Sequence, residues 1–185
     1  MSSVADTYKV LVAGDEETGY SLCLRLTDKD IVDPRVQAVE SLSRDWPKDE
    51  WTKFYTVSLE GKISTVKLDL ELHGPWVWEL YNVMDPKDYF RRFDGAIICG
   101  NPKRPDSLGV ISSLIESIES NIAAKIPIII IVDSTNELKE KEIAPFEEVA
   151  NSLNIAFVAV NIQNGKNIED VFKNLARVIH QNERR

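Results

Sequence analysis

The 185-residue sequence predicts a single α/β domain with a mostly parallel sheet, helices on both faces and one antiparallel edge strand. Apolar runs alternate with helical stretches along most of the chain. The run "PIIIIV" at residues 127–132 is apolar throughout, as a strand covered on both faces requires. Residues 50–74 have the alternating pattern of a β-hairpin, which supplies the antiparallel edge.

The elements follow in a regular order. "KVLVAG" at residues 9–14 predicts the first strand, and "GYSLCLRL" at residues 19–26 predicts a helix. The turn of the hairpin falls at residues 60–62. After a polar helical stretch, the remaining predicted elements are a strand at 95–100, a helix at about 107–124, a strand at 126–133, a helix at about 146–153, a strand at 155–161 and a helix at 168–180. In such sheets ligands bind beyond the carboxyl ends of the strands, so the loops that follow Val12, Leu70, Ile98, Val132 and Val160 are the place to look.

The segment between the first helix and the hairpin, residues 27–50, has its own periodic pattern. Apolar residues recur at spacings of three and four, at Val32, Val36, Val39, Leu42 and Trp46. This pattern predicts an amphipathic helix that begins at Asp33 and Pro34. Two interpretations are open: the helix packs on the edge of the sheet, or it binds a partner protein.

Composition and charge limit the classes of function. The net charge of -8 argues against DNA or RNA as a main partner, because phosphate binding draws on clustered Lys and Arg. Cys23 and Cys99 fall in a predicted helix and a predicted buried strand, which suggests reduced core thiols. The longest apolar run, residues 126–132, is far below the ~20 residues that cross a bilayer, and no signal peptide or lipid-anchor motif is readable. We therefore expect a cytoplasmic protein without a direct membrane anchor.

Read with its loop residues, the order of elements resembles the small GTPases of the Ras superfamily, most closely the Rab-like branch. The resemblance covers nearly the whole chain, through "YKVLVAGDEETGYS", "VSLEGKISTVKLDLELHG", "YFRRFDGAIICGNPKRPDSL", "IPIIIIVDSTNEL" and "IAFVAVNIQNGKNIEDVFKNLARVI". It implies the three-layer Ras-like (P-loop NTPase) fold, with a six-stranded sheet, over residues 1–185.

The phosphate loop of that family is changed in this sequence. In the family, backbone N–H groups wrap the phosphates, a Lys reaches the outer phosphates, and a Ser or Thr holds magnesium. Gly14, Gly19 and Ser21 keep their positions, but Tyr20 replaces the Lys and residues 15–17 are acidic. These acids oppose phosphate binding. In another interpretation the glycines form a tight turn from strand to helix, with the acids favoured by the helix dipole.

Tyr20 itself has two interpretations. Its ring fills the space left by the phosphates, or it projects from the surface as a contact residue.

The other nucleotide motifs also depart from the family. At the metal-proximal turn Glu71 replaces Asp and Gly74 is kept, but Pro75 replaces the Gln that orients the attacking water. GTP hydrolysis by the family mechanism is therefore not supported. At the base-reading strand, Glu137 stands at the Asp position. The resemblance thus leaves a vestigial set of cofactor-binding residues: Gly14, Gly19, Ser21, Glu71 and Glu137. These residues have that role only if the protein binds a nucleotide.

The sequence therefore favours a nucleotide-independent pseudo-GTPase that acts as a protein–protein interaction module or adaptor subunit, with a role in membrane trafficking by family analogy. Trp76 and Trp78 fall at the second switch and are the predicted partner-binding residues, because Trp is enriched at interface hot spots. In the other interpretation one Trp packs under the next helix and the other caps the vacant cleft.

No cofactor, catalytic residue or metal ligand is predicted on this interpretation, since His73 and His180 are isolated. Two alternatives stay open. One is a divergent small GTPase that binds GTP or GDP with magnesium through a non-standard phosphate loop. The other is an enzyme on the same frame with a different small ligand.

Overall fold

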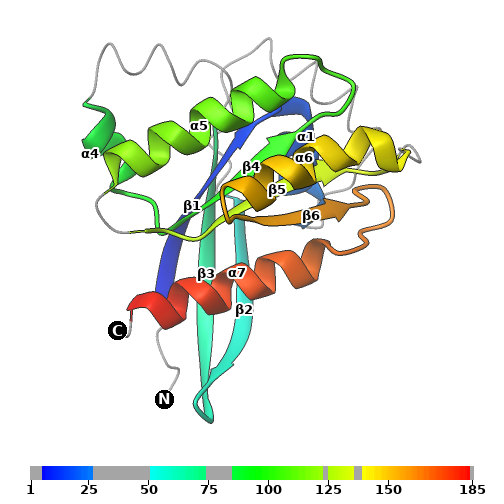
Figure 1. Ribbon diagram of the computed structural model, residues 1–185. Coiled ribbons are helices and arrows are strands. Elements are labelled where there is room, and N and C mark those ends of the chain that lie inside the picture. Colours follow the sequence, from blue (N-terminus) through cyan, green and yellow to red (C-terminus); the bar gives the residue numbers. More distant parts are fainter. Residues whose placement is uncertain (1–5, 27–50, 74–84, 123–124, 136–138, 184–185) are drawn as a thin grey trace, which may run out of the picture.

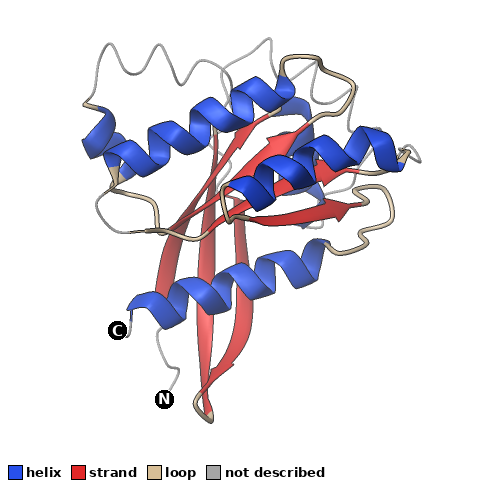
Figure 2. Cartoon of the chain, in the orientation of Figure 1, coloured by secondary structure: helices blue, strands red, loops and turns tan. Residues whose placement is uncertain are grey.

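A computed structural model describes residues 6–26, 51–73, 85–122, 125–135 and 139–183 of the chain. They form one six-stranded sheet in the order β2-β3-β1-β4-β5-β6 (Figures 1 and 2). The strands are β1 (Asp6–Gly14), β2 (Trp51–Leu59), β3 (Lys62–Leu72), β4 (Gly95–Gly100), β5 (Ile128–Asp133) and β6 (Ala156–Val160). β2 runs antiparallel to β3 and every other pairing is parallel, which confirms the predicted fold class.

Helices cover both faces of the sheet. They are α1 (Glu16–Leu26), α4 (Pro86–Phe90), α5 (Ser107–Asn121), α6 (Glu140–Ser152) and α7 (Ile168–Glu183). Successive residues of a strand point to opposite faces. In β1, Val10 and Val12 pack with α1 and α7, whereas Leu11 and Ala13 pack with α4, α5 and α6. The sheet is therefore the middle of three layers, as the apolar strands predicted.

The β2–β3 hairpin turns where the sequence indicated. Glu60 has a φ of 51° and Gly61 a φ of 78°, the two positive values that a tight two-residue hairpin turn requires. The hairpin reaches beyond the body of the sheet in Figure 1. Residues 27–50, with the predicted amphipathic helix, lie outside the described residues.

Two helix starts differ from the sequence-based expectation. α1 begins at Glu16, three residues early, and α6 begins at Glu140 although Pro145 lies within it. The start of α6 is fixed by Glu142, whose carboxylate accepts the backbone N–H of Lys139 at 2.9 Å. Pro145 leaves a single carbonyl without its helical partner, and that carbonyl belongs to the exposed Lys141. The predicted start at residue 146 was therefore wrong.

The two cysteines lie in the core as reduced thiols, as predicted. Burial raises the pKa of Cys23 to about 12. In the part of the chain that the structure describes, no helix has the length and apolar character to cross a membrane.

Candidate functional site

The candidate site lies at the carboxyl ends of β1 and β4, which are neighbours in the sheet. From β1 the chain continues to β2 and β3 on one side, then to β4 on the other, so the strand order reverses at this point. In open α/β sheets ligands bind at such a reversal. Asp15 and Asn101 are the first residues beyond these two strand ends, and the N–H of Asp15 donates to the carbonyl of Cys99 at 2.8 Å.

The segment that resembles a phosphate loop forms the first turn of α1. The backbone N–H of Gly19 donates to the carbonyl of Asp15 at 2.9 Å, and that of Thr18 donates to the Asp15 carboxylate at 3.0 Å. A phosphate loop keeps such amides free to wrap the ligand. Here they bond within the chain, as the interpretation of a tight strand-to-helix turn expects.

Gly14 and Gly19 each have a packing reason to be glycine. A Cβ on Gly14, whose φ is +103°, would lie 2.3 Å from the carbonyl oxygen of Cys99. A Cβ on Gly19 would lie 2.8 Å from the side chain of Leu72 on β3. Ser21 is buried in the same helix. These three predicted site residues are therefore brought together at the junction of α1 with the sheet.

Tyr20, at the position of the family's lysine, packs inward. Its ring meets Trp51 edge-on, with 5.7 Å between the ring centroids and 88° between the ring planes. It is partly buried against the core on the α1 side of the sheet. The residue at this position therefore contributes packing at the start of β2 and does not project from the surface.

Glu71 is not brought to Ser21. Leu72 faces α1, so the preceding residue on the strand points to the other face of the sheet. There Glu71 forms an ion pair with Arg92 at 3.0 Å. The Arg92 guanidinium also lies over the rings of Tyr89 and Phe93, 5.0 and 4.9 Å from their centroids. The carboxylate at the metal-proximal position is therefore already bound to a cation of the protein.

His73 follows on the same chain segment. Its ring meets Tyr89 and Phe93 edge-on, with centroid distances of 5.4 and 6.0 Å. Burial, with a further contribution from the Arg92 charge, lowers the pKa of His73 to about 4. The imidazole is therefore neutral near pH 7. In the described residues no group of three or more His, Cys, Asp or Glu side chains is placed to hold a metal ion.

The loops after β5 and β6 are bonded to each other. Ser134 donates both its backbone N–H and its hydroxyl to the carbonyl of Val160, at 2.7 and 2.8 Å. One oxygen of Asp133 accepts from the N–H and hydroxyl of Thr135 and, at 3.3 Å, from the N–H of Ile162. The polar groups at the start of the base-reading segment thus hold the two loops together. Glu137 lies outside the described residues.

The sequence interpretation missed a cluster around Asp15. The side chain of Asp15 is only 2% exposed. It accepts from the hydroxyl of Thr18 at 2.7 Å and from the amide of Asn101 at 3.4 Å, and Arg104 forms an ion pair with it at 3.4 Å. An Asp directly before a helix is a common N-cap, and that signal was available. The partners Asn101 and Arg104 lie far from Asp15 in the sequence, so no local signal could indicate them.

The predicted partner-binding residues Trp76 and Trp78, with Gly74 and Pro75, also lie outside the described residues.

The comparison with known proteins bears on the whole fold. No curated protein matches the sequence. A family model described as the Ras family matches residues 9–181, which is most of the chain. With the sheet order and the site geometry described above, this match shows that the chain belongs to the Ras family of small GTPase-like proteins.

Proposed function

We propose that this protein is a nucleotide-independent, Rab-like pseudo-GTPase that serves as a protein–protein interaction module or adaptor subunit. The observation that carries the proposal is the winding of the phosphate-loop segment into α1, which begins at Glu16. The amides of Thr18 and Gly19 bond within the chain, so they are not free to wrap phosphates.

Two further observations support the loss of the nucleotide switch. Glu71 is paired with Arg92 on the face of the sheet opposite α1, so it would have to leave that ion pair to approach a magnesium ion near Ser21. At the base side, Ser134 and Thr135 are engaged in bonds that join the loops after β5 and β6. A site built for specific hydrogen bonds loses discrimination when its partners are missing.

The decisive experiment is a titration of nucleotide-stripped protein with fluorescent GDP and GTP, with magnesium and with EDTA, up to millimolar concentration. We expect no saturable binding. A Kd below about 10 µM, roughly -7 kcal/mol, would sink the proposal and establish the alternative of a divergent GTPase with a non-standard phosphate loop. Tyr20→Lys is the companion variant, and we expect no gain in affinity because α1 occupies the place of the loop.

The partner face is proposed to include Trp76 and Trp78, as the sequence predicts. The test is affinity capture from a cytoplasmic extract with the wild type, Trp76→Ala and Trp78→Ala. Phe54→Ala is the matched control, because this aromatic side chain of β2 is 58% exposed. We expect proteins that are retained by the wild type and the control but lost from both Trp variants. Vesicle-coat or tethering proteins among them would support the trafficking role, and equal retention by all four would refute this partner face.

A further inference from the structure

The buried Asp15 carboxylate has partners on two separate parts of the chain. A buried charge is stable only when it is paired and hydrogen-bonded. One oxygen accepts from the N–H and the hydroxyl of Thr18, at 3.0 and 2.7 Å. The other faces the amide of Asn101 and the guanidinium of Arg104, each at 3.4 Å. Donors from α1 and from the loop after β4 therefore converge on a single carboxylate.

The backbone of the β4 loop and the Asn101 amide are held in position independently of Asp15, whereas the Arg104 side chain is 62% exposed. The backbone N–H of Asn101 donates to the Ser107 hydroxyl at 2.9 Å, and the Asn101 side-chain oxygen accepts from the N–H of Lys103 at 3.0 Å. This leaves the Asn101 NH₂ group directed at Asp15. The N–H of Arg104 donates to the carbonyl of Asn101 at 3.0 Å, so its backbone is fixed by the same turn.

Carboxylates and phosphates are both oxyanions, and they are recognised by the same donors: backbone N–H groups at a helix start, hydroxyls, amides and Arg. We infer that the Asp15 carboxylate is an internal substitute for a bound anion, which keeps these donors occupied and joins α1 to the loop after β4 without a ligand. The inference rests on the proposed function, since it explains how the reversal point of the sheet stays ordered without nucleotide.

The test removes the internal anion and supplies an external one. In Asp15→Ser the hydroxyl still accepts the N–H of Thr18, so the helix cap is kept while the carboxylate is lost. The probe is 20 mM inorganic phosphate, compared with chloride at equal ionic strength. For a millimolar site we expect the thermal midpoint of Asp15→Ser to rise by about 5 °C, against less than about 1 °C for the wild type. The same phosphate should shift the amide resonances of Thr18 and Asn101 only in the variant.

Two further variants decide the result. Asp15→Asn fills the same volume without charge, and we expect no phosphate response from it. Asp15→Ser combined with Arg104→Ala should lose the response of the single variant. An Asp15→Ser protein that is folded by circular dichroism but responds to phosphate no more than the wild type overturns the inference. That failure would leave the proposed function standing, because the proposed function is decided by nucleotide binding to the unmodified protein.

Discussion

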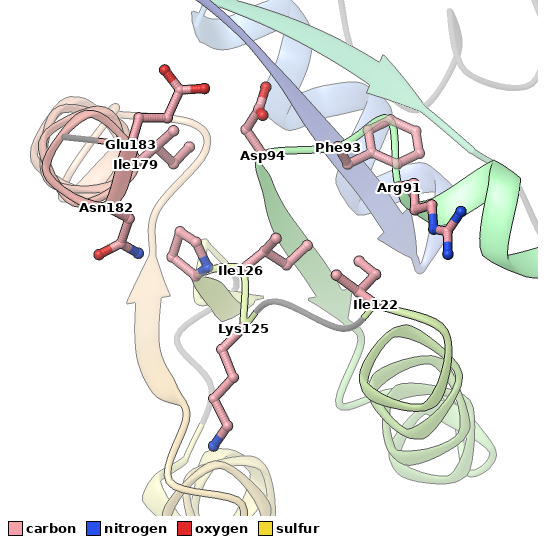
Figure 3. A pocket seen from close by; sticks show the side chains of 10 residues that line it. Arg91, Phe93, Asp94, Ile122, Lys125, Ile126, Ile179, Asn182 and Glu183 are labelled. Carbon is pink, nitrogen blue, oxygen red and sulfur yellow. The ribbon is translucent and has the colours of Figure 1, made fainter. Parts of the chain in front are cut away.

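The two ends of the sheet differ in how open they are. At the carboxyl end, Asp15 and Asp133 are bonded to neighbouring loops and helix starts. At the amino end, between the last turns of α5 and α7, there is a groove of about 390 Å³ (Figure 3). Its lining comprises Arg91, Phe93, Asp94, Ile122, Lys125, Ile126, Pro127, Ile179, Asn182 and Glu183.

The charges of the groove do not neutralise one another. In Figure 3 the carboxylates of Asp94 and Glu183 lie on one side, and Lys125 points away from them. The ion pairs found among the described residues include none between these acids and Arg91 or Lys125. The end where α/β sheets usually bind ligands is therefore bonded to itself, whereas an open groove with a mostly apolar lining lies at the opposite end.

The largest loss of stability is expected when Gly14, the glycine that ends β1, is replaced. In Gly14→Ala the new methyl group would meet the Cys99 carbonyl at 2.3 Å, and the φ of +103° is strained for alanine. We expect a loss of about 4 kcal/mol in the free energy of unfolding, measured by urea denaturation. Gly61→Ala is the control, because its φ is also positive but no atom lies within 4 Å. It should lose about 1 kcal/mol. Equal losses would show that the close contact at the carboxyl end is unimportant.

A pH-dependent effect is expected at His73. Its folded pKa of about 4 lies below the ordinary value of 6.5, so the unfolded chain binds the extra proton first as the pH falls. His73 therefore leaves stability unaffected above pH 6.5 and lowers it progressively from pH 6.5 to 4, by about 2 to 3 kcal/mol. His73→Gln should remove this part of the pH dependence. Urea midpoints of both proteins at pH 7.5 and 4.5 measure it, and parallel losses in the two would contradict the prediction.

A smaller loss of stability is expected when the hydrogen bonds between the loops after β5 and β6 are removed. Asp133→Ala leaves the N–H groups of Thr135 and Ile162 without their acceptor, and we expect a loss of about 2 kcal/mol in the free energy of unfolding. Hydrogen exchange should also speed up at these two amides. Asp88→Ala is the control, since that side chain is 70% exposed and its ion pair with Arg91 measures 3.9 Å. It should change stability by less than about 0.5 kcal/mol.

The smallest change in stability is expected for a substitution in the amino-end groove. Lys125→Glu reverses a charge that points away from Asp94 and Glu183, so the free energy of unfolding should stay within about 0.5 kcal/mol of the wild type. Chemical denaturation at low salt measures this. A loss above about 1 kcal/mol would mean that Lys125 stabilises the fold electrostatically, and the contrast between the two ends would no longer hold.

Much of the fold could be predicted because its signals are local. The unbroken run of isoleucines in β5 indicates a strand buried on both faces, and the pairing of β5 with β4 and β6 bears this out. Glu60 and Gly61 mark the hairpin turn on their own. Such patterns need only the residues of one element.

The site could be predicted only in part, because its contacts join distant positions. Asn101 is 86 residues from Asp15, and Arg92 is 21 residues from Glu71. Neither separation follows from a motif. The start of α1 was ambiguous for another reason: two glycines five residues apart fit both a phosphate loop and a helix packed closely on a sheet. The close approach of Leu72 to Gly19, which favours the helix, is visible only in three dimensions.

The early start of α1 also determines what a nucleotide would meet at this end of the sheet. Residues 16–19 lie in a helix, so wrapping a phosphate with their amides would require a different main-chain conformation. A lysine at position 20 would lie on the second turn of this helix and would leave the first turn as it is. Nucleotide binding through the backbone amides of this segment would need the first turn of α1 to unwind and Asp15 to leave its cap. Several coordinated changes would therefore be needed to turn this segment into a phosphate loop, so we expect no single substitution to do so.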